Sequence, residues 1–443
     1  MSCTTTANTV VHGHDSYEIT NIHVIDVVAG QIDYKNRLCI VDGVIADESG
    51  KPCKHNIRNN RTIDGQGGYL TPGLIDLHVH MFEKQGLVFA LSHGVTHVRI
   101  MNGVSHQLQW RDDVNAGKYL ASTATVSSPI ISGYENAIVH HGLTTSEEAR
   151  AAVKKYHEQG YDLIKAYGNL SESAFSALMD ESRKLSIPVA KHGPNVPEPL
   201  HIRDYADMQS YEHVEDIFYV ALDRENNIEK LKPFIDTFKR INVPIAPTLN
   251  IYAQLTRLSD EKESYLNQLP HYYISNIFAL EDKGNQVKRW LKAPKEKAEQ
   301  NQQTLKFLLR MTKALHDAGI PLVVGSDSGN LLSPHGIATH NEMRLFAEAG
   351  IDSFSILQSA TSIAAKTLGL GDEIGQIKQG FNADFIYTIN NPIKNLNTLK
   401  TPDAVVKRGI WLDRAALQEL RAKAKKSKRL WPELKVYSEM ITR

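Results

Sequence analysis

The sequence is short of cysteine, of a charge excess and of long apolar runs. Its three cysteines, Cys3, Cys39 and Cys53, have no paired metal spacing; they give no disulfide framework and suit a reducing compartment. Fifty Lys and Arg residues balance fifty Asp and Glu residues, so no charge excess draws the chain to nucleic acid or anionic lipid. No apolar run approaches the roughly 18 residues of a membrane span, and the N-terminus lacks a basic region followed by an apolar one. These absences favour a cytoplasmic enzyme with a small-molecule substrate, and leave open whether it is a homo-oligomer.

The chain divides into three zones. Residues 17–72 carry short β-branched runs separated by Gly, Asp and Asn, which is typical of a small sheet. Between residues 73 and 368, apolar runs alternate with helix-period segments such as 146–160, 172–186 and 301–319. There are eight such runs, at 74–81, 95–101, 124–132, 162–168, 187–193, 209–214, 243–250 and 321–327.

Eight strands alternating with helices predict an α/β fold of the (β/α)₈ TIM-barrel type over residues 73–368. From residue 369 the chain returns to strands, and a closing helix is expected within 412–426. We therefore expect residues 1–72 and 369–443 to join in one small β-sandwich domain with a C-terminal helix.

One part of the barrel region departs from this alternation. A long polar stretch, centred on an insertion around residues 253–300, stands where a short loop is expected. Insertions of this length are active-site lids or plain helical elaborations, and the sequence leaves both open.

The first chemically informative motif is the His-x-His pair of the run at 74–81. Alternate side chains of a strand point the same way, so His78 and His80 share one face. Two neutral imidazoles on one face can hold a divalent ion. Further polar residues end later runs: His192, His213 and Asp327. Because barrel enzymes place their active sites at the carboxyl ends of the strands, the shared position predicts one metal site.

Lys165 is the least expected member of this set. It lies in an apolar run at the same strand-end level as the histidines, where an unpaired charge is costly to bury. A salt-bridged or snorkelling lysine is the alternative explanation.

The order His-x-His, Lys, His, His, Asp on successive strands resembles the amidohydrolase superfamily. The segments PGLIDLHVH and ATSIAAKTLGLGDEIGQIKQGFNADFI carry the same resemblance. It covers most of the chain apart from the insertion and the C-terminal end. It is nearest to the imidazolonepropionase-like and prolidase-like group with a binuclear centre.

The resemblance implies two divalent ions, zinc by default, and an N-carboxylated Lys165 that bridges them. It implies that His78, His80 and Asp327 hold the first ion and that His192 and His213 hold the second. Two ions about 3.5–4 Å apart can share and activate a water, so a metal-bridged hydroxide is the expected nucleophile. Asp327 is then the catalytic base that passes a proton to the leaving amine. The expected reaction is hydrolysis of an amide C–N bond, in a dipeptide or an N-acyl amino acid.

Candidates for substrate contact lie at or after other strand ends. They are His140, His141, Tyr167, Tyr252, Arg99 and His335. For Arg99, pairing with a neighbouring acid is the alternative to contact with a substrate carboxylate.

Three rival functions stay open. A mononuclear deaminase of the superfamily normally has a Glu a few residues after the fifth-strand histidine, whereas here the first acid after His192 is Glu198. Cyclic-amide or ester hydrolysis uses the same metal chemistry. A non-catalytic amidohydrolase-like protein is expected to have lost metal ligands, and none of the six is replaced.

Overall fold

The computed structural model describes residues 16–49, 53, 61–193 and 205–442. The N-terminal segment discussed above (residues 1–15) and Glu198 lie outside the described residues. Among the described residues, no helix is both long and apolar enough to cross a lipid bilayer.

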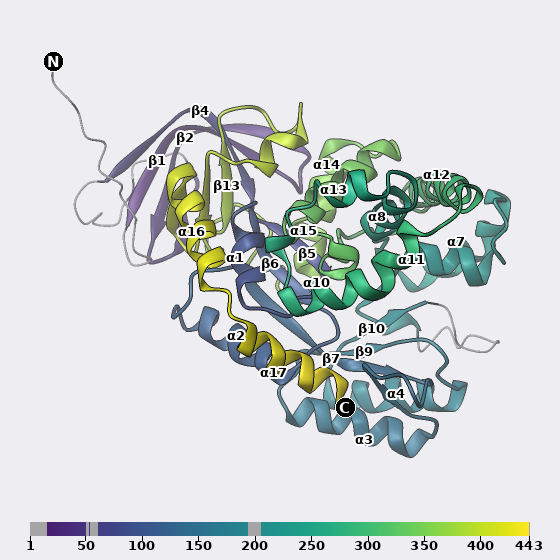
Figure 1. The fold of residues 1–443 in the computed structure, drawn as a ribbon. Helices are drawn as coiled ribbons and strands as arrows, with labels where there is room; N and C mark the ends of the chain where they lie inside the picture. Colours follow the sequence, from purple (N-terminus) through teal and green to yellow (C-terminus); the bar gives the residue numbers. More distant parts are fainter. Residues whose placement is uncertain (1–15, 50–52, 54–60, 194–204, 443) are drawn as a thin grey trace.

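The chain forms two sheets (Figure 1). The first has seven strands in the order β15-β14-β13-β4-β1-β2-β3. Its strands are β1 (Tyr17–Asp26), β2 (Gln31–Val41), β3 (Val44–Asp47), β4 (Thr62–Pro72), β13 (Phe385–Thr388), β14 (Ala404–Lys407) and β15 (Ile410–Asp413). β13 pairs with β4, so strands from both ends of the chain share one sheet, as the sequence predicts.

The second sheet is parallel and forms the barrel. Its strands are β5 (Leu74–Val79), β6 (Val95–Ile100), β7 (Thr123–Ser132), β8 (His140–Gly142), β9 (Leu163–Ala166), β10 (Val189–His192), β11 (Ser210–Glu212) and β12 (Ile245–Ala246). β8 lies beside β7, off the main strand order. Residues 322–328 bridge β12 to β5 through the pairs Ile245–Leu322 and Val79–Ser328 and so close the ring. The predicted barrel with a separate small sheet domain is confirmed; the domain boundaries at 72 and 368 stay a prediction.

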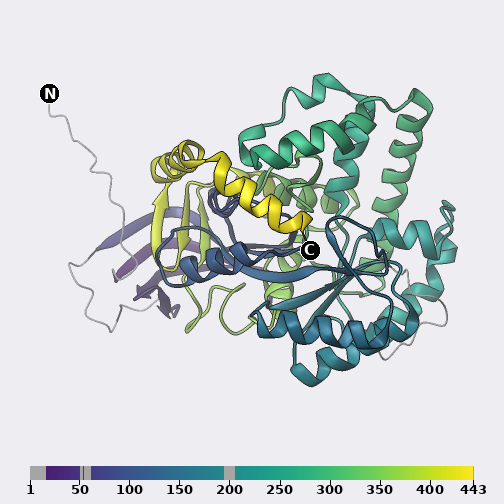
Figure 2. The same ribbon diagram turned by 60° about the horizontal axis from the view of Figure 1, so that its bottom comes forward.

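Helices cover the barrel and extend from it (Figures 1 and 2). They are α1 (Gln85–Leu91), α2 (Ser105–Asn115), α3 (Ser146–Glu158), α4 (Glu172–Leu185), α6 (Val214–Asp216), α7 (Lys232–Ile241), α8 (Leu249–Asp260), α9 (Glu263–Leu266), α10 (Asn276–Asp282), α11 (Lys288–Leu291), α12 (Lys295–Asp317), α13 (Ile337–Glu348), α14 (Ser353–Ser359), α15 (Ser362–Thr367), α16 (Arg414–Ser427) and α17 (Leu430–Ile441). α3 shows why its sequence is helical: Thr145 and Glu148 form a reciprocal capping box at its start, and Ala149, Ala152 and Val153 are buried against the core.

The insertion around 253–300 folds into helices, α8 to α11 and the start of α12, and its role as a lid stays a prediction. At the C-terminus, the expected closing helix is α16, and a second helix, α17, follows it. Strand residues such as Leu74, Val98 and Ile164 join helix residues such as Leu178 and Phe307 in one large apolar core.

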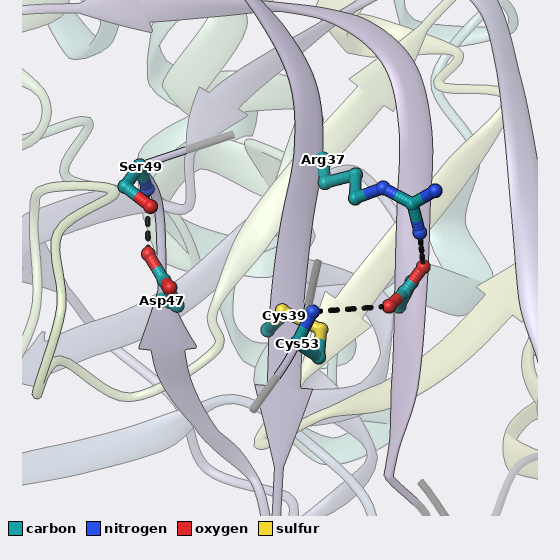
Figure 3. Close-up of a disulfide and its surroundings, with 6 residues drawn as sticks. Arg37, Cys39, Asp47, Ser49 and Cys53 are labelled. Carbon is teal, nitrogen blue, oxygen red and sulfur yellow. Dashed lines mark hydrogen bonds and ion pairs between the residues drawn. A yellow bond between two sulfur atoms is a disulfide. The ribbon is translucent and has the colours of Figure 1, made fainter. Parts of the chain in front are cut away.

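One expectation about cysteine is wrong. Cys39 of β2 and Cys53 form a disulfide, with Cα atoms 5.8 Å apart (Figure 3). The sequence could not indicate the pair, because a separation of 14 residues fixes no distance until the chain folds back after β2. The Glu18 carboxylate accepts a hydrogen bond from the Cys53 N–H and pairs with Arg37 beside it.

Candidate metal centre

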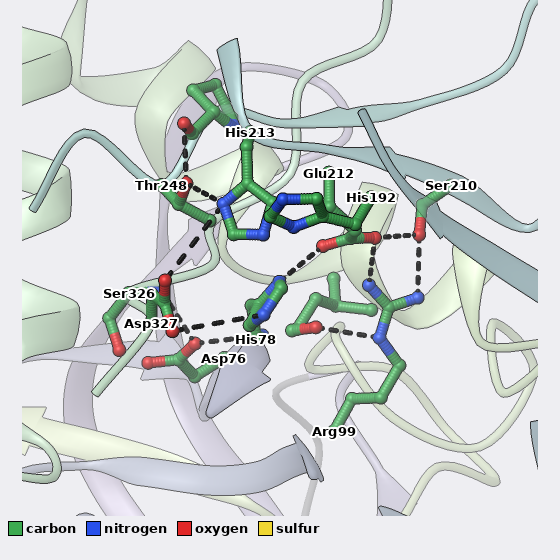
Figure 4. A network of polar contacts seen from close by, with 12 residues as sticks. Asp76, His78, Arg99, His192, Ser210, Glu212, His213, Thr248, Ser326 and Asp327 are labelled. Atoms are coloured by element: carbon green, nitrogen blue, oxygen red, sulfur yellow. Dashed lines mark hydrogen bonds and ion pairs between the residues drawn. The ribbon is translucent and has the colours of Figure 1, made fainter. Parts of the chain in front are cut away.

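All six predicted ligands line one cavity of about 880 Å³ at the carboxyl ends of the barrel strands. They are His78, His80, Lys165, His192, His213 and Asp327. Donor atoms of His78, His213 and Asp327 lie within 4.8 Å of one another, and all three side chains are buried (Figure 4). His80 Nε2 is 3.0 Å from Asp327 Oδ1. The His192 ring centroid is 4.2 Å from that of His213.

The closing segment brings Asp327 to the histidines. The Asp327 N–H donates to the His78 carbonyl, and the His80 N–H donates to the Ser328 carbonyl. Gly325 permits this approach, because a Cβ there would lie 2.9 Å from the His78 Cβ.

The backbone is strained at three points of the site. His213 has φ +72°, Thr248 has φ +53° and Asp327 has φ +51°, all in the region that non-glycine residues rarely adopt. Such strain persists where surrounding contacts enforce it, and it gathers at functional sites. Here Thr248 Oγ1 lies 2.7 Å from His213 Nδ1, so two of the strained residues hold each other.

Burial keeps His78, His192 and His213 neutral. It lowers the pKa of His78 to about 4, with the Lys165 charge adding to the effect, and lowers the pKa of His213 well below its usual value. Neutral imidazole is the form that binds metal. Burial alone would raise the pKa of Asp327, but the hydrogen bond with His80 holds it below its usual range. The donor set therefore fits a divalent cation.

Lys165 fits the same centre. Its side chain is buried, and its Nζ has no hydrogen-bond partner among the described residues. Burial lowers the pKa of the Lys165 amine to about 8. The alternative of a salt-bridged lysine finds no support in these contacts.

A buried pair that the sequence did not reveal supports His78. The Glu212 carboxylate lies 2.7 Å from His78 Nδ1 and 2.6 Å from Arg99 Nη2 (Figure 4). Ligand histidines are commonly oriented by a carboxylate on their second ring nitrogen. An acid in an apolar run, next to a predicted ligand, is the signal by which Glu212 could have been found.

Among the candidates for substrate contact, only Tyr167 lines the cavity, and its ring stacks on His192 with centroids 3.9 Å apart. Arg99 is fully buried inside the barrel and pairs with an acid, Glu212, instead of lining the cavity. His140 and His141 contact Ser132 and Tyr156, respectively. Tyr252 lines a neighbouring pocket and lies beside Tyr219. His335 is buried against Ser328.

Part of the chain matches a known protein family, and several solved structures share the fold. Residues 275–412 match the amidohydrolase family. No curated protein is significantly similar in sequence. Solved structures that share the fold include a bottromycin amidohydrolase at 22% identity, covering 93% of this chain and 90% of that one, with a TM-score of 0.76. A putative prolidase from Bifidobacterium longum shares 22% identity over 93% of this chain and 99% of that one, with a TM-score of 0.68. Ochratoxinase from A. niger shares 17% identity over 90% and 96%, with a TM-score of 0.65.

The family match and the shared fold confirm the resemblance to the amidohydrolase superfamily and its prolidase-like members. At identities of 17–22%, the three solved structures show a shared fold and not a shared reaction.

Proposed function

We propose that the protein hydrolyses an amide C–N bond, in a dipeptide or an N-acyl amino acid, with two divalent metal ions, zinc by default. The observation that carries the proposal is the convergence of six side chains from five runs of the barrel on one cavity, with donor atoms of His78, His213 and Asp327 within 4.8 Å of one another. Chance seldom places so many ligand side chains at one rim, which is where barrel enzymes carry their chemistry.

His78, His80 and Asp327 would hold one ion, and His192 and His213 the other. Lys165 would bridge them as a carbamate, formed when its neutral amine makes an N–C bond to carbon dioxide and one proton leaves. This modification replaces a buried cation by an anion, which accounts for an Nζ that lacks a protein partner. Bound ions of this kind lower the pKa of water and polarise a carbonyl.

The protein's own groups would complete the reaction. Asp327, which lines the cavity beside His80, would take the proton of the attacking water and pass it to the leaving nitrogen. Glu212 would keep the Nδ1 of His78 occupied, so that Nε2 stays directed at the ion.

The test is release of free amine from a panel of dipeptides and N-acyl amino acids by zinc-loaded protein. We expect cleavage of at least one member, and a loss of about 1,000-fold or more in kcat for Asp327→Asn. Asp236→Asn is the matched control, because Asp236 lies on the exposed side of α7 in an ion pair with Lys232. Zinc-loaded protein that releases no amine from any member would contradict the proposal.

A further inference from the structure

The outer part of the metal-centre cavity is walled by apolar side chains from segments far apart in the chain. They come from the loop after β7, from α8, α10 and α17: Ile138, Val139, Ile251, Phe278, Tyr437 and Ile441. Its volume of about 880 Å³ is that of a pocket for a drug-sized molecule rather than for a small polar one. We propose that this outer pocket binds a large, uncharged, apolar group of the substrate. This inference rests on the proposed amide hydrolysis at the inner end of the cavity.

Two apolar side chains at this pocket are left open to solvent. Ile138 is 71% exposed and Ile441 is 41% exposed. Scattered exposed aliphatic residues need no explanation, but two that line one cavity form a patch of the kind that marks a binding site. Covering them with an apolar group of the substrate would remove this surface from water.

The charges around the pocket argue against a carboxylate at the far end of the substrate. Among the described residues that line the cavity, Lys165 is the only lysine or arginine, and it lies with the metal ligands. Glu281 also lines the cavity, as does Glu215, for which burial raises the pKa well above its usual value. A distant carboxylate would therefore meet the Glu281 side chain and no cation from the described wall.

The C-terminal helix α17 is fastened in place as part of this wall. The Glu433 carboxylate, which is buried, accepts hydrogen bonds from the Ser275 hydroxyl and the Ile277 N–H at the start of α10. Further along α17, Glu439 accepts a hydrogen bond from the Ser105 hydroxyl of α2. The pocket is thus preformed, which lowers the entropy cost of binding an apolar group.

The test uses N-acyl glycines that differ only in the acyl group, cleaved by the zinc-loaded full-length protein: acetyl, hexanoyl, decanoyl, and a ten-carbon chain that ends in a carboxylate. Burial of a methylene group is worth about fourfold in binding. We expect kcat/KM to rise by about 100-fold or more from acetyl to decanoyl, and to fall by about tenfold or more when the carboxylate ends the chain.

Two variants locate the effect. Ile441→Asp and Ile138→Asp change residues that are already exposed, so both proteins should fold, as thermal unfolding will verify. Each should lower kcat/KM for decanoylglycine about tenfold and leave acetylglycine within about twofold. The matched control is Trp431→Asp, on the same helix, 67% exposed and outside the cavity lining, which should change neither.

The outcomes separate this inference from the proposed function. Equal kcat/KM for acetyl, decanoyl and carboxylate-ended substrates would overturn the apolar pocket while amide hydrolysis stands. If no acyl glycine is cleaved, binding of decanamide is measured by calorimetry. Binding with a negative heat-capacity change, which Ile441→Asp abolishes, would support the pocket without the activity. Failure of decanamide to bind would overturn the pocket.

Discussion

Replacing Glu212 by Gln removes the charge from the middle of the buried network beneath the metal centre. Neither Glu212 nor Arg99 is exposed to solvent. Arg99 also donates from Nε to the Leu77 carbonyl at 2.7 Å and from Nη1 to the Ser210 hydroxyl at 2.7 Å, so its guanidinium has no route to water. Burial would raise the pKa of Glu212, but Arg99 and His78 hold it below its usual range, so the carboxylate is ionised.

Removing one partner of such a pair leaves the other charge buried alone, which costs about 3–5 kcal/mol. Loss of a carboxylate behind a ligand histidine lowers metal affinity by about 10–100-fold. We therefore expect Glu212→Gln to lower the thermal unfolding midpoint of the metal-free protein by several degrees and to weaken zinc binding to His78.

Circular dichroism melts of the metal-free protein and competition of zinc against a chelator measure the two effects separately. The double variant Arg99→Met/Glu212→Gln is the control, since removing the unpaired cation should restore part of the stability but not the zinc affinity. If Glu212→Gln is destabilised by less than about 1 kcal/mol and its zinc affinity is unchanged, Glu212 neither balances the Arg99 charge nor orients His78.

Three further predictions concern stability. Burial raises the pKa of Asp282 to about 7, so the folded protein is most stable below about pH 4, where the carboxyl is neutral, and loses stability as the pH rises toward 7. Asp282→Asn carries no such charge, so its melting temperature should exceed that of the wild type by a margin that grows from pH 5 to pH 8. A margin that stays constant with pH would count against this role of Asp282. Gly133→Ala places a Cβ 1.6 Å from the Asn169 carbonyl oxygen and should cost about 2–4 kcal/mol, whereas Gly284→Ala, with open space around it, should be neutral in the same melts. Cys39→Ser removes the disulfide to Cys53 and should lower the free energy of unfolding by about 3 kcal/mol. A wild-type melting temperature that does not change when reductant is added would speak against the disulfide.

Local sequence patterns were enough to predict the barrel and the convergence of the six cavity residues. Alternation along the strand fixes that His78 and His80 share one face, and this is a local property of the chain, whereas Asp327 also depends on its backbone contact with His78 across the closed ring.

Other features depend on which segments meet in three dimensions. Arg99 and Glu212 are 113 residues apart and find each other only across the barrel interior. The contribution of α17 to the cavity depends on the hydrogen bond between Glu433 and the N–H of Ile277 at the start of α10, 156 residues earlier in the chain. The disulfide likewise follows from the fold of the strands around Cys39.

Metal content per chain tests the proposed two-metal centre that Lys165 would bridge. Plasma emission spectrometry of zinc-loaded, gel-filtered protein should find close to two ions per chain for the wild type. Lys165→Ala should bind fewer and lose amide hydrolysis, while added bicarbonate should increase metal loading of the wild type only. One ion or none in the wild type, unchanged by Lys165→Ala, would contradict a two-metal centre bridged by Lys165.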